Sequence, residues 1–198
     1  AVEQMGLSHV VITAVARDDL DDGGASGFVK TLRSIRKRVP EVSVEILIPD
    51  FRGRVDALEC VLAEQPDVVN HNLETVARLQ RAVRSNAGYA RSLTLLARAK
   101  ERGLITKSGL MTGLGETDDE LISALGDLAC VGVDIVTIGQ YLRPTTDHLP
   151  VQRWVNPETF QMLAERAREL GFRHVEAGPL TRSSHKAARG LRSFTTTA

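Results

Sequence analysis

The chain has 198 residues, of which 42% are hydrophobic, and its 25 basic side chains balance its 25 acidic ones. This length and composition predict one soluble domain with a substantial core. The zero net charge argues against a nucleic-acid partner, which would favour a basic face. No apolar run approaches the length of a bilayer-spanning helix and no signal-peptide pattern opens the chain, so we expect no membrane partner.

The first residues, 1–6, have the pattern of the last turn of a helix that ends at Gly6. A domain rarely begins inside a helix. We therefore expect a further segment before Ala1 in the parent protein.

Strand-like apolar runs then alternate with amphipathic helical patterns. Strands are expected at 9–15, 42–50, 67–74, 105–116, 134–142 and 173–180. Helices are expected at 28–39, 54–66, 75–84, 92–103, 117–132 and 156–171. Ser92 is the expected cap of its helix, Thr117 and Glu120 form an expected capping box, and Ser183 or Ser184 could cap a last basic helix.

This alternation predicts an α/β fold with a parallel sheet covered by helices. An open doubly wound sheet would concentrate polar side chains at one switch point, whereas a (β/α) barrel spreads them over several strand ends. Nearly every expected strand here ends in a polar cluster. We therefore predict a barrel or partial barrel of the TIM type, as one domain over 1–198 that includes the segment 178–198.

Three polar stretches are candidate sites. The acidic loop 17–25 is not a calcium loop, because Val29 stands at the twelfth position, where a glutamate is needed. Asn70, Asn72 and Glu74 alternate near a strand end and should point the same way, towards a polar small molecule. His71 between them is expected to be packed or hydrogen-bonded rather than a ligand.

The glycine-rich stretch 109–117 lacks the lysine and hydroxyl residue of a phosphate-binding P-loop. Lys107 is a possible Schiff-base lysine. Cys60 and Cys130 are expected to be small core residues in a reducing compartment and do not form a metal site. The residues alone therefore indicate a barrel that binds a polar small ligand.

Seven blocks closely resemble one family. They are VVITAVARDDLDDGGA, LIPDFRGR, VVNHNLETV, TKSGLMTGLGET, TIGQYLRPT, HLPVQRWV and GPLTRSSHKA. They occur in order, almost from Ala1 to about Ala188, and resemble the lipoyl synthases of the radical S-adenosylmethionine superfamily. The resemblance implies a partial TIM barrel and two [4Fe-4S] clusters. One cluster, on a CxxxCxxC loop, cleaves S-adenosylmethionine to a radical, which removes hydrogens from an octanoyl chain on a lysine of a carrier protein; the auxiliary cluster supplies the sulfur.

The resemblance also implies residues around S-adenosylmethionine. Near the adenine it places the residues that match the fifth-strand pattern, Gly109, Met111, Gly113 and Glu116. Asn72 and Glu74 fall on the fourth-strand segment, near the ribose and the amino acid. The end of the second strand, where relatives hold the methionine amino group, carries Thr13, Arg17 and Asp18. Arg84 and Gln140 are further candidates for the carboxylate and the adenine.

The C-terminal Arg-Ser-Ser motif implies a ligand of the auxiliary cluster: Ser184, with Ser183 as the second choice and Arg182 beside it. His185 stands where the family motif has tyrosine, and Ala16 where relatives often have aspartate. The family's iron-binding cysteines are absent, so the resemblance places both cysteine motifs and the first barrel strand before Ala1. We expect this chain alone to hold neither cluster and to be inactive.

The implied partners of the intact protein are octanoylated lipoyl-carrier domains, such as the E2 subunits of 2-oxoacid dehydrogenases and the glycine cleavage H protein. An electron donor such as ferredoxin or flavodoxin is also implied. The expected compartment is the cytoplasm of a bacterium, or the mitochondrial or plastid matrix of a eukaryote. Two alternatives stay open: a non-catalytic module that binds the cofactor or carrier, and a metal-free barrel enzyme such as an aldolase that uses Lys107.

Overall fold

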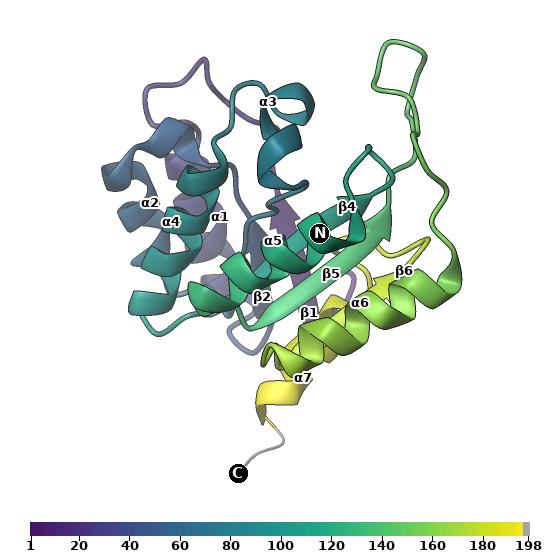
Figure 1. Ribbon diagram of the computed structural model, residues 1–198. Coiled ribbons are helices and arrows are strands. Elements are labelled where there is room, and N and C mark those ends of the chain that lie inside the picture. The colour runs from purple at the N-terminus through teal and green to yellow at the C-terminus, as the bar shows by residue number, and fades with distance from the viewer. Residues whose placement is uncertain (196–198) are drawn as a thin grey trace.

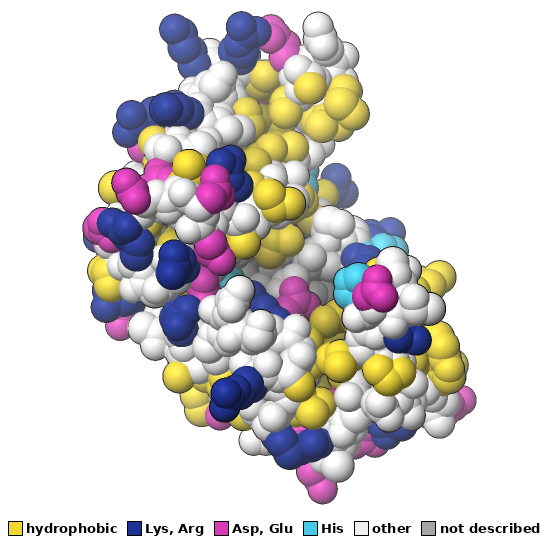
Figure 2. Space-filling model, turned by 90° about the horizontal axis from the view of Figure 1, so that it is seen from above, with side chains coloured by type: hydrophobic (Ala, Val, Ile, Leu, Met, Phe, Trp, Pro, Cys, Tyr) yellow, Lys and Arg dark blue, Asp and Glu magenta, His cyan; other side chains and the backbone are white. Residues whose placement is uncertain are grey.

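The computed structural model describes residues 1–195 as one parallel sheet with helices against it (Figure 1). The strands are β1 (His9–Thr13), β2 (Ser43–Leu47), β3 (Val68–Asn70), β4 (Ile105–Thr112), β5 (Ile135–Gln140) and β6 (His174–Gly178). They lie in the order of the chain, and every neighbouring pair is parallel. Figure 2 shows the molecule from above as a curved body hollowed at its centre. The predicted α/β fold, a partial barrel of parallel strands, is confirmed.

The helices follow the strands in alternation. The long ones are α1 (Ala25–Arg38), α2 (Val55–Leu62), α4 (Tyr89–Glu101), α5 (Asp118–Cys130), α6 (Pro157–Glu169) and α7 (Ala187–Thr195). The short ones are η1 (Phe51–Gly53), η2 (Ala77–Leu79) and α3 (Gln80–Val83). In the part of the chain that the structure describes, no helix combines the length and the apolar character needed to cross a membrane.

The hydrophobic core lies between the sheet and its outer helices. Outward side chains of the central strands are fully buried there, among them Val44, Ile46, Val136 and Ile138. Helix α5 contributes residues at helical spacing, Leu121, Ala124, Leu125 and Leu128. Each fully buried leucine stabilises the fold by about 1.5–3 kcal/mol. Alternation along each strand turns the intervening side chains to the hollow inner face, where the sheet is polar.

Helix α5 begins as the sequence predicts. The Thr117 side chain accepts a hydrogen bond from Glu120 N at 3.2 Å, and Glu120 Oε2 accepts one from Thr117 N at 2.9 Å. This capping box satisfies two backbone donors that would otherwise lack partners. It fixes the direction in which the chain leaves the β4–α5 loop.

Two expected caps are wrong. Helix α4 begins at Tyr89, so Ser92 lies inside it and is fully buried, with its hydroxyl 2.9 Å from His71 Nε2. The last helix begins at Ala187, beyond both serines, and only the backbone oxygen of Ser184 bonds to its first residue. In both cases the serine side chain does not cap the helix that the spacing suggested.

The expected burial of the cysteines is also wrong. Cys60 and Cys130 are both exposed free thiols, near the ends of α2 and α5. Both helices turn other apolar side chains to the sheet, and each cysteine falls on the outer side of its helix. Residues 1–6 form turns, with Met5 N donating to Ala1 O at 2.9 Å, and the chain leaves them at Gly6 with a φ of 59°.

Candidate ligand-binding cavity

A cavity of about 760 Å³ opens at the carboxyl ends of β3 to β6. Its lining comes from the inner faces of β4 and β5, the segment after β3, and the segment after β6. A further wall comes from residues 142–155, which we call the arm, because they leave β5 and project from the body before α6 (Figure 1). The carboxyl edge of a parallel sheet is the usual place for a ligand in this class of fold.

The floor of the cavity is backbone. A Cβ on Gly109 of β4 would lie 2.9 Å from both Asn72 Oδ1 and Thr137 Oγ1. Only glycine therefore lets these two polar side chains face each other across the strand. The floor is open to a ligand and is flanked by hydrogen-bonding groups.

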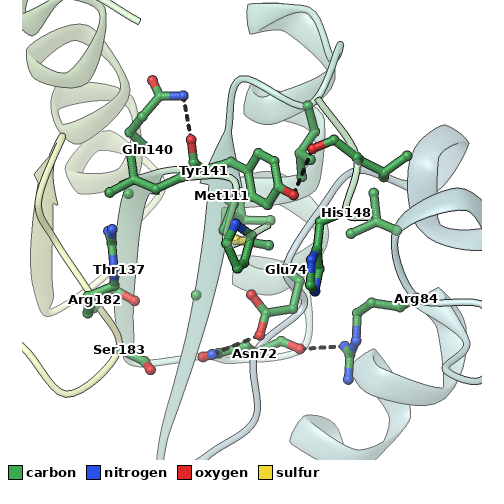
Figure 3. A pocket seen from close by; sticks show the side chains of 18 of the residues that line it. Asn72, Glu74, Arg84, Met111, Thr137, Gln140, Tyr141, His148, Arg182 and Ser183 are labelled. Carbon is green, nitrogen blue, oxygen red and sulfur yellow. Dashed lines mark hydrogen bonds between the residues drawn. The ribbon is translucent and has the colours of Figure 1, made fainter. Parts of the chain in front are cut away.

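Asn72 and Glu74 form the polar centre of the cavity (Figure 3). Asn72 Nδ2 donates to Glu74 Oε1 at 3.1 Å, and Arg84 donates from Nη1 to the backbone oxygen of Asn72 at 2.8 Å. Asn72 Oδ1 is buried and has no hydrogen-bond partner among the described residues. A buried acceptor without a partner costs stability, so the arrangement suits a ligand that brings a donor.

Glu74 is held in an unusual backbone conformation, with a φ of 70°. Its N–H donates to Gly109 O at 2.8 Å, and its own carbonyl accepts from Met111 N at 2.8 Å, so β4 fixes it on both sides. Burial raises the pKa of its carboxyl above the usual range, against smaller opposing effects of Asn72 and Arg84. A ligand cation or hydroxyl beside it would relieve that desolvation.

The loop after β4 is shaped by Gly113, whose φ is 94°. A Cβ there would overlap Gln140 Nε2 and Arg153 O. Glu116 accepts hydrogen bonds from Gly113 N at 2.6 Å and Leu114 N at 2.9 Å. The glycine-rich stretch therefore binds its own carboxylate rather than a phosphate.

Gln140 joins this loop to the arm. Its Nε2 donates to Thr112 O at 3.2 Å and to Arg153 O at 3.1 Å, and its Oε1 accepts from Val155 N at 3.0 Å. The side-chain amide is thus fully used by the protein, although the residue lines the cavity.

The structure brings together eight of the residues that the sequence singled out: Asn72, Glu74, Arg84, Gly109, Met111, Gln140, Arg182 and Ser183. Gly113 and Glu116 stand behind them in the β4–α5 loop. Arg182 and Ser183 come from the segment after β6 and lie across the cavity from Arg84 (Figure 3).

The remaining candidates lie elsewhere. Thr13 and Arg17 line a separate pocket of about 300 Å³ between β1 and α1, and Asp18 is exposed on the loop that follows β1. Ser184 faces a shallow pocket on the side of β1, with His9 and Val11. The two adjacent serines therefore line different pockets. Ser183 lines the cavity, and Ser184 lines the shallow pocket beside β1.

Lys107 does not reach the cavity. It is fully buried on the inner face of β4, with Nζ 2.9 Å from Glu45 Oε1 and 3.2 Å from Glu45 Oε2. Asn70 Nδ2 donates to the same carboxylate at 2.9 Å. A Schiff-base lysine needs a free amine exposed to a carbonyl substrate. This geometry does not support the aldolase alternative.

Three further polar residues line the cavity without a role expected from the sequence: Thr137, Asp147 and His148. The inward direction of Thr137 could be predicted from strand alternation, since Thr137 lies two positions before Gly139 on the inner face of β5. Asp147 and His148 carry no local signal, because only the course of the arm brings them back over the cavity.

Comparison with known proteins identifies the family. Residues 1–128 match the model of the radical SAM superfamily. The chain is 57% identical over 189 residues to a lipoyl synthase of Symbiobacterium thermophilum, covering 94% of this chain and 59% of that protein. It is 51% identical over 193 residues to a lipoyl synthase of Caldanaerobacter subterraneus, covering 96% of this chain and 68% of that protein. The chain belongs to the lipoyl synthase family.

A solved structure agrees in fold. Coproporphyrinogen III oxidase from Escherichia coli, a radical SAM enzyme, superposes with a TM-score of 0.63 at 17% identity, covering 83% of this chain and 41% of that one. The chain spans about three fifths of the length of the first lipoyl synthase, 59%. The family match therefore concerns the barrel described here and not the whole length of a lipoyl synthase.

Proposed function

We propose that this chain is the cofactor-binding barrel of a lipoyl synthase, whose intact form inserts two sulfur atoms into the octanoyl chain of an octanoyl-lysyl carrier protein. The observation that carries the proposal is the 57% identity over 94% of this chain to a lipoyl synthase. The cavity supports it, because its polar centre and its size suit a nucleoside-sized ligand beside an acyl chain.

S-adenosylmethionine fits the residues present. It carries ribose hydroxyls and an ammonium group, which are donors, and the cavity offers the unpartnered Asn72 Oδ1 and the desolvated Glu74 carboxylate. Arg84 lies beside these two residues and could pair with the carboxylate of S-adenosylmethionine. When bound and reductively cleaved, the cofactor supplies a radical able to remove hydrogen from an unactivated carbon. The chain's own residues bind and orient the cofactor between the sheet and the arm.

Iron–sulfur clusters do not fit the described residues. A [4Fe-4S] cluster needs thiolate ligands, and the two cysteines are exposed near the ends of different helices. No group of three or more histidine, cysteine, aspartate or glutamate side chains within residues 1–195 could hold a metal ion. The proposed role of Ser184 as a cluster ligand depends on thiolates from residues outside this chain.

The proposed partners follow from the proposed reaction. The substrate is a lipoyl-carrier domain with an octanoylated lysine, such as an E2 subunit of a 2-oxoacid dehydrogenase or the glycine cleavage H protein. A small electron-transfer protein such as ferredoxin or flavodoxin is the proposed reductant. The cavity opens at the rim of the barrel, where a lysine side chain on a folded carrier has access.

The test uses the intact protein with S-adenosylmethionine, a reductant and an octanoyl-lysyl peptide. We expect mass spectrometry to show a peptide in which two hydrogens are replaced by two sulfurs. Glu74→Gln should weaken S-adenosylmethionine binding about tenfold by calorimetry, since it removes the charge that a donor would meet. Binding of the cofactor without any sulfur insertion would favour the non-catalytic binding module instead.

A further inference from the structure

The arm holds one exposed side chain in place. Residues 142–150 are exposed, yet the backbone around His148 is fixed from several directions. Arg143 Nε donates to His148 O at 2.8 Å, and His148 N donates to Thr145 O at 3.2 Å. The hydroxyl of the buried Tyr141 donates to Leu149 O at 2.9 Å. These contacts fix the position of residue 148 before any ligand arrives.

The imidazole ring is fixed as well. Its Nδ1 lies 2.9 Å from Thr145 Oγ1, and that hydroxyl also accepts from Asp147 N at 3.3 Å. The opposite nitrogen, Nε2, has no hydrogen bond to any residue in the described range 1–195. His148 lines the cavity, and Figure 3 shows it on the side of the arm, with Glu74 and Arg84 in the same space. The arm therefore presents one hydrogen-bonding nitrogen to the cavity.

The wall that the arm forms beside His148 is mostly apolar, and Asp147 is its charged residue. Leu142, Pro144 and Leu149 of the arm line the cavity together with the ring of Tyr141. The polar centre at Asn72 and Glu74 belongs to the segment after β3, so the two kinds of wall come from different parts of the chain. The cavity thus has a polar region at Asn72 and Glu74 and, on the arm, a mostly apolar region that contains the fixed imidazole of His148 beside the carboxylate of Asp147.

The proposed substrate has matching chemistry. An octanoyl-lysyl side chain consists of saturated carbon on both sides of one amide, and that amide is its only hydrogen-bonding group. The amide lies between the reacting carbons, which must reach the interior, and the carrier, which stays outside. A hydrogen-bonding side chain on the rim of an apolar wall is the arrangement that such a group requires.

We propose that His148 is a substrate-binding residue that hydrogen-bonds the amide of the octanoyl-lysyl group and so sets how far the acyl chain enters the cavity. This inference rests on the proposed function. Tyr141 and Arg143 are positioning residues, because they act on the substrate only by holding the arm around His148.

The experiment measures binding to the intact protein by calorimetry with two peptides, one bearing an octanoyl-lysine and one bearing an unbranched alkyl side chain of the same length, which lacks the amide. His148→Ala should weaken binding of the octanoyl peptide about three- to tenfold, the range expected for one hydrogen bond, and leave binding of the alkyl peptide unchanged. Thr146→Ala, on the same arm, is the matched control and should alter neither. Tyr141→Phe should act in the same direction as His148→Ala.

Two outcomes would overturn the inference. One is equal affinity of the wild type and His148→Ala for the octanoyl peptide. The other is a loss of S-adenosylmethionine affinity in His148→Ala as large as the loss for the peptide, which would place the imidazole against the cofactor. Failure of the wild type to bind the octanoyl peptide at all would instead contradict the proposed function.

Discussion

His71 is a histidine with no contact to the cavity and two hydrogen bonds inside the protein. Its Nδ1 lies 2.8 Å from Ile48 O, which can only accept, so Nδ1 carries the proton and Nε2 accepts from the Ser92 hydroxyl. The neutral ring joins the segment after β2, the segment after β3 and helix α4. Burial lowers its pKa from 6.5 to about 4.

This burial predicts a pH dependence of stability. The unfolded chain takes up a proton at His71 near pH 6.5, whereas the folded chain does so only near pH 4. The free energy of unfolding should therefore be highest above pH 6.5, fall as the pH drops from 6.5 to 4, and lose about 3 kcal/mol through this residue. Urea denaturation across this range measures it.

The reference for that measurement is the wild type. Replacing His71 by glutamine should remove its share of the pH dependence of the free energy of unfolding. A His71→Gln protein whose stability still falls as steeply as the wild type between pH 6.5 and 4 would contradict the assignment.

At the scale of residues, the sequence predicts whether a side chain is packed or binds a ligand better than it predicts which residue that side chain contacts. The packed role of His71 follows from its place between alternating residues at a strand end. Its partner Ser92 was misread as a cap, because nothing local shows that the helix starts three residues earlier. His148 shows the same limit, since its role depends on a cavity formed by distant segments.

The β4–α5 loop is the element that ties the cavity to the arm, and Gly113 is the residue at its turn. Its φ of 94° and the overlap of any Cβ with Gln140 and Arg153 leave no room for a side chain. Gly113→Ala should destabilise the protein by about 2–4 kcal/mol, through backbone strain and displacement of the Gln140 amide. Chemical denaturation measures the loss.

A glycine on the neighbouring helix provides the matched control. Gly126 lies within α5, and a Cβ there would meet no atom within 4 Å. Gly126→Ala should stabilise the protein by about 0.5–1 kcal/mol, because alanine favours the helix. Equal effects of the two substitutions would show that the fit around Gly113 does not matter.

Elements with strong local signals were predicted closely. The capping box of α5 and the proline and asparagine at the start of α6 mark their helices in sequence and in structure. The strand expected at 67–74 ends at Asn70. Beyond it the chain bends to place Glu74 against β4, a pairing between distant segments that alternation alone does not reveal.

On the scale of the whole molecule, the buried pair of Lys107 and Glu45 connects β4 to β2 across β3. Removing one partner leaves an uncompensated charge in the interior, so Lys107→Met should cost about 3–5 kcal/mol. The double variant Lys107→Met with Glu45→Gln keeps an acceptor for Asn70 Nδ2 and should regain most of that loss. Chemical denaturation of the wild type, Lys107→Met, Glu45→Gln and the double variant gives the four free energies of unfolding that a double-mutant cycle needs.

A double variant no more stable than Lys107→Met would show that the charge left on Glu45 is not the source of the loss. The pair itself was not predicted, although the fold was. Alternation of strands and helices predicts a parallel sheet, and the polar strand ends favour a barrel. The register between neighbouring strands decides which inward side chains come into contact. The sequence of one strand alone does not reveal that register.

The order of the strands has a consequence for how the chain is made. Each strand from β2 onward pairs with the strand that came before it in the sequence. During synthesis, every new strand and helix therefore meets a partner that has already left the ribosome, and no early strand waits for a distant one. The cavity is completed last, because the segment after β6 supplies its final wall.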